Sequence, residues 1–226
     1  MKKAFTLPEV LITLGIIGIV ASLTTPVLIS NYQKQSTVVK LKKTYATLAQ
    51  MIDLAIIDHG FVKEWKRYDA KGVDNEFTNK YIEPYLLKTI KNSGGVGKTD
   101  NYINTIDGNT SLTTFSWYIL PNGTAITVFS NLIKETGNYG FIWIFADLNG
   151  PKKPNRLGKD IFMFDVFQNG ELAFWGQNRN NPLTKEELKN NKLYGCGKNV
   201  ATKYAGAYCG ALIEQNNWEI TDDYPW

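Results

Sequence analysis

The chain has 226 residues, of which 13% are aromatic and 20% are charged, and its formal net charge is +4. This length and aromatic content exclude an intrinsically disordered protein, because the chain has enough apolar material to fold around its own core. The small positive charge does not indicate a nucleic-acid-binding protein, and part of it comes from Lys2 and Lys3 at the N-terminus.

The first 30 residues have the pattern of a membrane segment. Two lysines precede the small residue Ala4, and after Glu9 the 20 residues 10–29 contain no charge. Such a stretch can cross the ~30 Å hydrocarbon core of a bilayer as one helix, and the lysines favour a cytoplasmic start. A secretory signal peptide carries its small-residue cleavage site after the apolar core. Cleavage at Ala4 would instead leave the helix on the mature chain.

Glu9 is the residue of this segment that most needs an explanation. A carboxylate in or beside a membrane helix is costly, and such residues tend to be functional. The simpler alternative places Glu9 at the headgroup level, where an acid is favourable in the first turn of a helix. A signal anchor or an uncleaved signal peptide accounts for the lysines and the apolar run, but not for the sequence Ala4-Phe5-Thr6-Leu7-Pro8-Glu9.

These first 30 residues resemble the N-terminus of type IV prepilins and type II secretion pseudopilins. The resemblance implies that a prepilin peptidase cuts between Ala4 and Phe5 and methylates the new amine of Phe5. Ala4 departs from the glycine that is usual before the cut. The resemblance also implies that Glu9 pairs with the Phe5 amine of a neighbouring subunit, a desolvated pair whose disruption costs roughly 3–5 kcal/mol. Pro26, near the end of the apolar run, predicts a helix kink.

The implied function is that of a structural subunit, not an enzyme, in a type IV pilus or a type II secretion pseudopilus. The implied partners are the prepilin peptidase, other pilin or pseudopilin subunits, an inner-membrane assembly platform and membrane lipid. The implied location is the bacterial inner membrane, crossed once with the head extracytoplasmic, followed by a periplasmic or extracellular filament. The alternative is a monomeric membrane-anchored extracytoplasmic binding protein, which predicts no cleavage at Ala4 and no effect of replacing Glu9.

The helix is predicted to continue beyond the membrane to about Asp58, with Gly60 as its C-terminal stop. Apolar residues recur there at steps of four and three, which is typical of one face of an amphipathic helix: Leu41, Tyr45, Leu48, Ile52 and Ala55. The chain therefore divides into a leader (1–4), a transmembrane or filament-core helix (5–30), the amphipathic half of the same helix (31–59) and a globular head (60–226).

The head is predicted to be α+β, with a mainly antiparallel sheet covering the amphipathic half, which makes the whole chain pilin-like. Residues 61–91 predict short helices, best at 78–90, and the polar stretch 92–109 predicts a loop. Turn sequences at 121–123 and 168–170 predict hairpins and hence antiparallel pairing. Thr184 and Glu187 form a capping box for a helix at 185–191. The predicted strands are 112–120, 124–130, 141–146, 161–168 and 171–175.

The two cysteines, Cys196 and Cys209, lie near the C-terminus. In an exported chain this predicts a disulfide that closes a short loop, worth ~3 kcal/mol in the chain-entropy model. The alternative is two free, buried thiols. The aromatic tail 218–226 is interpreted as part of the core of the head, with an interaction patch as the weaker alternative.

Asp147, Asn149 and Asp160 are the candidate metal ligands of the head. Oxygen-bearing side chains at alternate positions followed by Gly150 suit a hard cation, and the stretch resembles the calcium-binding loop of some pseudopilins. No glutamate closes a calcium-hand loop, and Lys152 and Lys153 would oppose a cation. We therefore favour the interpretation that Asp147 and Asn149 cap turns through their own backbone. No other cofactor is expected.

Other candidate chemistry is weaker. Residues 94–99 look like part of a phosphate-binding loop, but Asn92 stands where the motif needs glycine, and the following residues do not predict a helix. His59 is the one histidine and is expected to finish the long helix. The remaining candidate is a basic cluster that we interpret as a solvated face near anionic headgroups, with DNA binding as a weaker alternative: Lys34, Lys40, Lys42 and Lys43.

Overall fold

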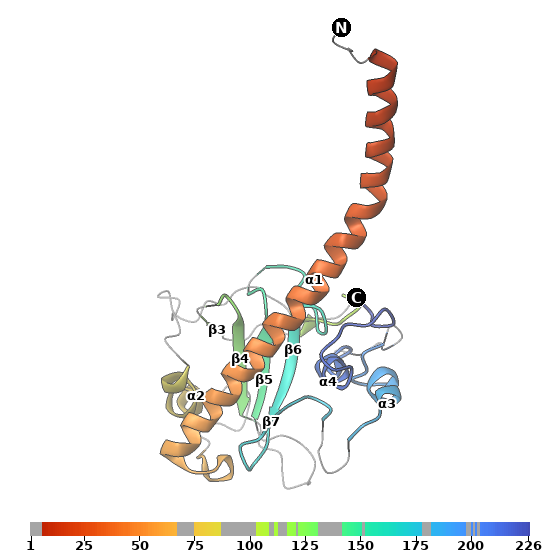
Figure 1. Ribbon diagram of the computed structural model, residues 1–226. Helices are drawn as coiled ribbons and strands as arrows, with labels where there is room; N and C mark the ends of the chain where they lie inside the picture. The colour runs from red at the N-terminus through yellow and green to blue at the C-terminus, as the bar shows by residue number, and fades with distance from the viewer. Residues whose placement is uncertain are drawn as a thin grey trace.

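The protein has an α+β fold in which one long helix lies across an antiparallel sheet and extends far beyond it (Figure 1). This is the pilin-like architecture that the sequence predicts. The computed structural model describes residues 6–66, 75–86, 103–108, 111–112, 117–120, 122–130, 142–150, 152–177, 182–197, 200, 202 and 204–226.

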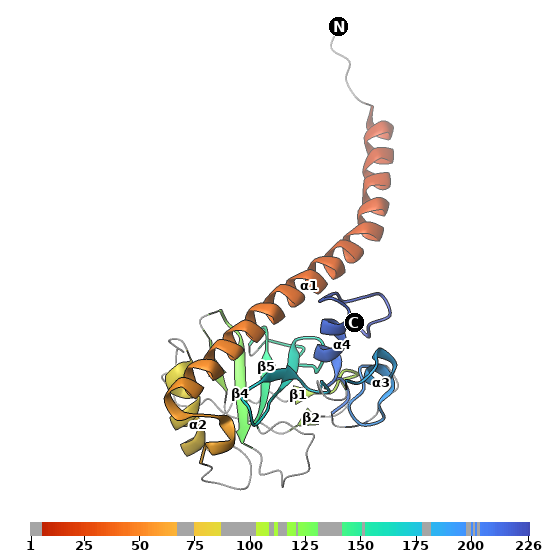
Figure 2. The ribbon, with the colours of Figure 1, turned by 60° about the horizontal axis from the view of Figure 1, so that its bottom comes forward.

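Helix α1 runs without interruption from Leu7 to His59. Pro8 sits in its first turn, where a missing backbone N–H costs nothing. Gly60 ends the helix with φ +76°, a left-handed value that favours glycine, and its N–H donates to the carbonyl oxygen of Ile56 at 2.9 Å. In both views the first half of α1 projects away from the head, and the helix bends before it reaches the sheet (Figure 1 and Figure 2).

Only the second half of α1 packs on the head. The predicted apolar face is confirmed. Tyr45, which belongs to this face, also donates its hydroxyl to the carbonyl oxygen of Leu172 at 2.8 Å. The Tyr45 ring also lies 5.5 Å from the ring of Phe174. Because such contacts bury large apolar surfaces, they fix the helix firmly to the sheet. The buried residues of α1 are Val38, Leu41, Thr44, Leu48, Met51, Ile52 and Ala55.

Within the described residues the main sheet has five strands in the order β3-β4-β5-β6-β7, and every neighbouring pair is antiparallel, as predicted. The register places Ile144 opposite Phe164, and Phe164 opposite Phe174, so these apolar side chains share one face of the sheet. The strand bounds are β3 Tyr118–Ile119, β4 Ala125–Ser130, β5 Ile142–Asp147, β6 Ile161–Val166 and β7 Leu172–Phe174.

The single strand predicted at 112–120 is wrong. Its beginning, β2 (Ser111–Leu112), pairs with β1 (Ile103–Asn104), whereas its end, β3, joins the main sheet. Strand β1 also corrects the loop predicted at 92–109. The backbone of Asn104 is held on its other side by Asn155 and Leu157, at 2.8 and 2.9 Å. Pairing between distant segments decides these short strands, and such pairing leaves no local signal.

The helix predicted at 78–90 is also wrong. Helix α2 spans Asn75–Tyr81, and a separate 3-10 turn, η2, spans Glu83–Tyr85. Pro84 explains the break, because proline lacks the backbone N–H that would continue the α-helix and its ring clashes with the carbonyl four residues earlier. Residues 87–90 of the predicted helix lie outside the described residues. A further 3-10 turn, η1, follows α1 at Val62–Glu64.

The predicted helix after Thr184 is confirmed as α3, Lys185–Asn190. Thr184 donates its N–H to the Glu187 carboxylate at 2.8 Å, and Glu187 donates its N–H to the Thr184 hydroxyl at 3.2 Å. These two bonds satisfy backbone donors that the helix itself leaves unpaired. The spacing of two residues in the sequence was therefore enough to place this helix.

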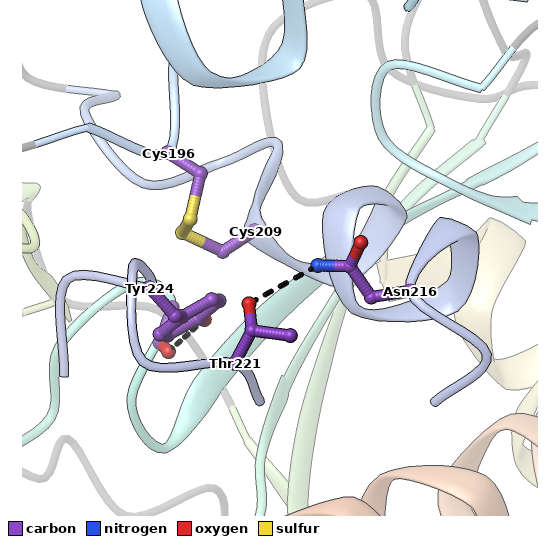
Figure 3. The surroundings of a disulfide bond; sticks show 6 residues. Cys196, Cys209, Asn216, Thr221 and Tyr224 are labelled. Carbon is purple, nitrogen blue, oxygen red and sulfur yellow. Dashed lines mark hydrogen bonds between the residues drawn. A yellow bond between two sulfur atoms is a disulfide. The ribbon is translucent and has the colours of Figure 1, made fainter. Parts of the chain in front are cut away.

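Helix α4, Cys209–Gln215, follows the disulfide between Cys196 and Cys209. The sequence did not predict α4, because seven residues are too few to display a helical period. Gly158 makes the fit around the sulfur possible: its φ is +80°, and a Cβ there would lie 2.5 Å from Cys209 Sγ. The Tyr224 hydroxyl donates to the carbonyl oxygen of Gly158, and Asn216 donates to Thr221, so the C-terminal segment closes over the disulfide (Figure 3).

Replacing both Cys196 and Cys209 by serine is expected to lower the free energy of unfolding by about 3 kcal/mol, because the bond spans 13 residues and restricts the unfolded chain. Chemical denaturation of the full chain in detergent measures the change. The reductant control has a clear expectation: the wild type should lose this stability on reduction, and the double variant should not respond. Equal stability of oxidised wild type and double variant would contradict the prediction.

Candidate functional site

The first half of α1 is a long apolar surface that the chain itself does not cover. Among the described residues, α1 is the one helix long and apolar enough to cross a membrane, and none of its apolar window is buried. Leu7 is 75% exposed and Leu23 is 70% exposed. Side chains of this kind require an apolar surrounding, either a bilayer or other apolar helices. This surface is the candidate functional site.

Glu9 stands at the beginning of the surface and is held in a fixed orientation. Both the backbone N–H and the hydroxyl of Thr6 donate to Glu9 Oε2, each at 2.8 Å. The carboxylate therefore closes the first turn of α1 as the acidic member of a capping box. Thr6 is a residue that our sequence reasoning missed, although its position three residues before Glu9 is the signal of such a box. The predicted cleavage and methylation residues, Ala4 and Phe5, lie outside the described residues.

Pro26 lies inside the continuous helix. Its ring cannot donate a hydrogen bond to the preceding turn, which weakens the helix locally. The bend of α1 lies between the exposed half and the half that packs on the sheet (Figure 1). That Pro26 causes the bend stays a prediction.

The structure brings Asp147, Asn149 and Asp160 together at the end of β5. The carboxylate of Asp160 accepts three hydrogen bonds, from Asn155 N at 2.8 Å, Arg156 N at 2.6 Å and Asn149 Nδ2 at 3.0 Å. Asp147 Oδ1 accepts from the backbone N–H of Asn149 at 3.1 Å. These bonds close two turns through the carboxylates of Asp147 and Asp160. Asp147 therefore caps a turn, as we favour from the sequence, whereas Asn149 instead donates its Nδ2 to Asp160.

Burial changes the acidity of this loop. Desolvation, with the charge of Asp160 as the second cause, raises the pKa of Asp147 to about 8. Desolvation also raises the pKa of Asp160, although its hydrogen bonds act in the opposite direction. Asp165, in β6, is a further buried acid that sequence reasoning missed, and desolvation raises its pKa to about 7. Each shift reflects the cost of burying a carboxylate charge.

A cation beside Asp147 and Asp160 would lower that cost, and the Asn149 and Asn155 side-chain oxygens, both buried without a hydrogen-bond partner, would also suit it. Within the described part of the chain, however, no three acidic, histidine or cysteine side chains gather into a metal-binding group. Calcium binding by Asp147, Asn149 and Asp160 therefore stays a prediction.

The basic cluster on α1 is only partly a solvated face. Lys34 Nζ lies 3.4 Å from Asp222 Oδ1, and Lys42 Nζ lies 5.5 Å from the centre of the Trp218 ring. Both partners belong to the aromatic C-terminal segment, whose contact with α1 the sequence did not reveal. His59 ends α1 as predicted, and its Nε2 lies 2.9 Å from the Tyr85 hydroxyl.

Comparison with known proteins decides the family. A protein-family model described as a family of unknown function (DUF6613) matches residues 27–226. The chain belongs to this family. A second family model, the prokaryotic N-terminal methylation motif, matches residues 1–25. This confirms the prepilin-type signal of type IV pilins and pseudopilins that the sequence predicts. No curated protein and no solved structure matches the chain.

The boundary between the two family-model matches lies inside α1. The methylation motif ends at residue 25 and the DUF6613 match begins at residue 27, yet the helix is continuous from Leu7 to His59. The signal segment is therefore the first half of the same continuous helix that crosses the head.

The Asp160 loop is tested by Asp160→Ala. When a chelator has removed calcium, the free energy of unfolding of the variant is expected to be about 3 kcal/mol lower than that of the wild type. The reason is that the N–H groups of Asn155 and Arg156 lose their acceptor. Denaturation of the full chain in detergent, with chelator or with saturating calcium, provides the measurement. A loss of stability seen only with calcium would contradict turn capping. If calcium raises the free energy of unfolding of the wild type, and Asp147→Asn abolishes this increase, the calcium prediction is confirmed.

Proposed function

We propose that this protein is a filament subunit of the pilin or pseudopilin type. It is made as a membrane prepilin, cut between Ala4 and Phe5 by a prepilin peptidase, and methylated at Phe5. It then leaves the bilayer by polymerising through the first half of α1, in a type IV pilus or a type II secretion pseudopilus. Its role is structural, and the work of polymerisation comes from a separate assembly ATPase.

The observation that carries the proposal is that the exposed apolar half of α1 lies largely within the methylation motif. A simple membrane anchor needs the apolar surface but has no need for the motif at residues 1–25. A subunit that moves from lipid into a helical bundle needs both. The bilayer surrounds the apolar half of α1 before assembly, and the helices of neighbouring subunits surround it afterwards. Gly15 and Gly18, where an added Cβ would meet nothing within 4 Å, allow close helix approach.

Glu9 would give this assembly its register. A carboxylate that enters an apolar bundle without a partner is strongly destabilising, so each subunit needs one cation at the depth of Glu9. Cleavage at Ala4 would create one such cation, the amine of Phe5, on every subunit. Pairing between Glu9 of one copy and Phe5 of the next therefore balances charge one to one. The bonds from Thr6 keep the Glu9 carboxylate oriented at the helix start while it awaits that partner.

Two substitutions of Glu9 separate its charge from its capping role. Glu9→Gln keeps an oxygen that accepts from Thr6, because glutamine also serves in a capping box. Glu9→Ala removes both roles. If the charge pair drives assembly, both variants are expected to be cleaved normally, but their amount in sheared filaments is expected to fall at least about tenfold. Breaking a buried charge pair costs roughly 3–5 kcal/mol, and even a fraction of this cost has such an effect.

Incorporation is measured by quantifying the protein in sheared filament fractions against its membrane pool. Normal incorporation of Glu9→Gln together with loss of Glu9→Ala would show that Glu9 acts only as a helix cap. Normal incorporation of both would contradict the pairing. Thr6→Val is the matched control, because it removes the hydroxyl donor to Glu9 and leaves the charge in place.

The rival function is a monomeric membrane-anchored binding protein with an extracytoplasmic head. It explains the apolar helix and the folded head equally well. It predicts an uncut N-terminus and no effect of either Glu9 variant. The methylation motif favours the filament subunit over this rival.

A further inference from the structure

A cavity of about 510 Å³ lies between α1 and the C-terminal segment, where the helix leaves the head. One wall is a single face of α1, at spacings of three, four, seven and eight residues. The other wall belongs to the segment after α4, which lies beside α1 in both views (Figure 1 and Figure 2). Its size is that of a small-molecule site. The lining residues are Asn31, Lys34, Gln35, Val38, Val39, Trp218, Glu219, Ile220 and Asp222.

The position of this cavity along α1 matches the depth of lipid headgroups. The apolar stretch ends at Ile29, and Asn31 to Gln35 follow it by two to six residues, or about 3–9 Å along the helix at 1.5 Å per residue. The headgroup layer on each side of the hydrocarbon is roughly 5–8 Å thick. With the apolar half of α1 in a bilayer, the cavity mouth therefore lies among the phosphates. Trp218 on its rim is a residue type enriched at this depth.

The cavity presents both signs of charge. The Lys34 side chain is only 17% exposed, and its ammonium lies 3.4 Å from the carboxylate of Asp222. The amides of Asn31 and Gln35 stand next to Lys34 on the same helix face. Glu219 and Asp222 on the opposite wall make the net charge of the lining −1. A bound group should therefore carry an anion for the helix wall and a cation for the acidic wall.

The acidic wall is held in place by contacts outside the cavity. Asp223 pairs with Lys189 of α3, while Trp218 packs edge-on against Tyr45 at 5.9 Å and against Phe174 at 5.7 Å. The backbone N–H of Trp218 donates to the carbonyl oxygen of Ile213 at 2.8 Å. These contacts hold the backbone of the segment that carries Glu219 and Asp222 beside α1, and Lys34 pairs with the exposed carboxylate of Asp222 from the helix side.

We propose that this cavity binds the headgroup of phosphatidylethanolamine while the protein is anchored in the membrane. The lipid phosphate accepts hydrogen bonds from Lys34 and the amides of Asn31 and Gln35. The ethanolamine ammonium donates to the carboxylates of Glu219 and Asp222. The inference rests on the membrane-anchored state of the proposed function. It adds a lipid that holds the head at a fixed height and tilt before the subunit enters a filament.

The chemistry of the two walls sets the specificity. Phosphatidylcholine has the same charges, but its trimethylammonium group has no N–H to donate. Phosphatidylglycerol has the phosphate without a cation, and its negative charge would face the acidic wall. Loss of one hydrogen bond to a charged group corresponds to about a tenfold change in affinity. The wild type is therefore expected to prefer phosphatidylethanolamine over both other lipids by about tenfold.

The test uses the full chain in vesicles that contain the three lipids in equal amounts. Flotation with the vesicles is measured first. The protein is then extracted in mild detergent, and native mass spectrometry counts the lipids that stay bound. Glu219→Gln, an isosteric change of an exposed side chain, is expected to reduce the preference for phosphatidylethanolamine over phosphatidylcholine several-fold. Asp53→Asn is the control, because it neutralises an exposed acid of α1 that neither lines the cavity nor holds its acidic wall.

Each outcome has one meaning. Selective retention of phosphatidylethanolamine that Glu219→Gln weakens and Asp53→Asn preserves supports the headgroup site. Flotation with equal retention of the three lipids, or equal loss in both variants, overturns the headgroup site and leaves the filament subunit intact. Failure of the wild type to float overturns both, because neither holds without membrane anchoring.

Discussion

The structure depends on one continuous helix whose two halves need different surroundings. From Val38 onward the buried face of α1 packs on η2 and β7, and the Tyr45 ring lies 6.2 Å from that of Phe164 in β6. The Tyr45 hydroxyl fixes the helix to the edge strand β7. Among the described residues, those from Thr6 to Ile29 are all exposed, and none of the apolar window of the helix is buried. Since no linker separates the halves, the apolar surrounding of the first half sets the position of the head. This coupling is what a filament subunit requires, and a freely tethered binding domain has no use for it.

The C-terminal part of the chain strengthens this coupling at the place where α1 leaves the head. The disulfide joins Cys209, at the start of α4, to the loop after α3, and Gly158 lets the sulfur approach β6. The segment that follows pairs with α1 through Asp222 and with α3 through Asp223. The rigid end of the head therefore lies next to the membrane side of the helix. The same arrangement creates the cavity in which we infer a lipid headgroup.

Much of this was accessible from the sequence because the signals are local. The uncharged run after Glu9, the stripe from Leu41 to Ala55, the turn at 168–170 and the capping box at Thr184 each depend on residues a few positions apart. The failures involve distant partners or an overlooked residue. Strands β1 and β2 exist because they pair with each other, and Lys34 meets Asp222 from the other end of the chain. Pro84 was a readable signal that should have ended the helix predicted at 78–90.

The central claim is that the chain is processed as a prepilin, and the mass of the mature protein tests it most directly. The measurement is intact mass together with the mass of the N-terminal peptide, on protein purified from its native membrane. The account predicts a chain that starts at Phe5 and carries one methyl group on its amine. A chain that retains Met1, or one cut beyond Ile29, would contradict it.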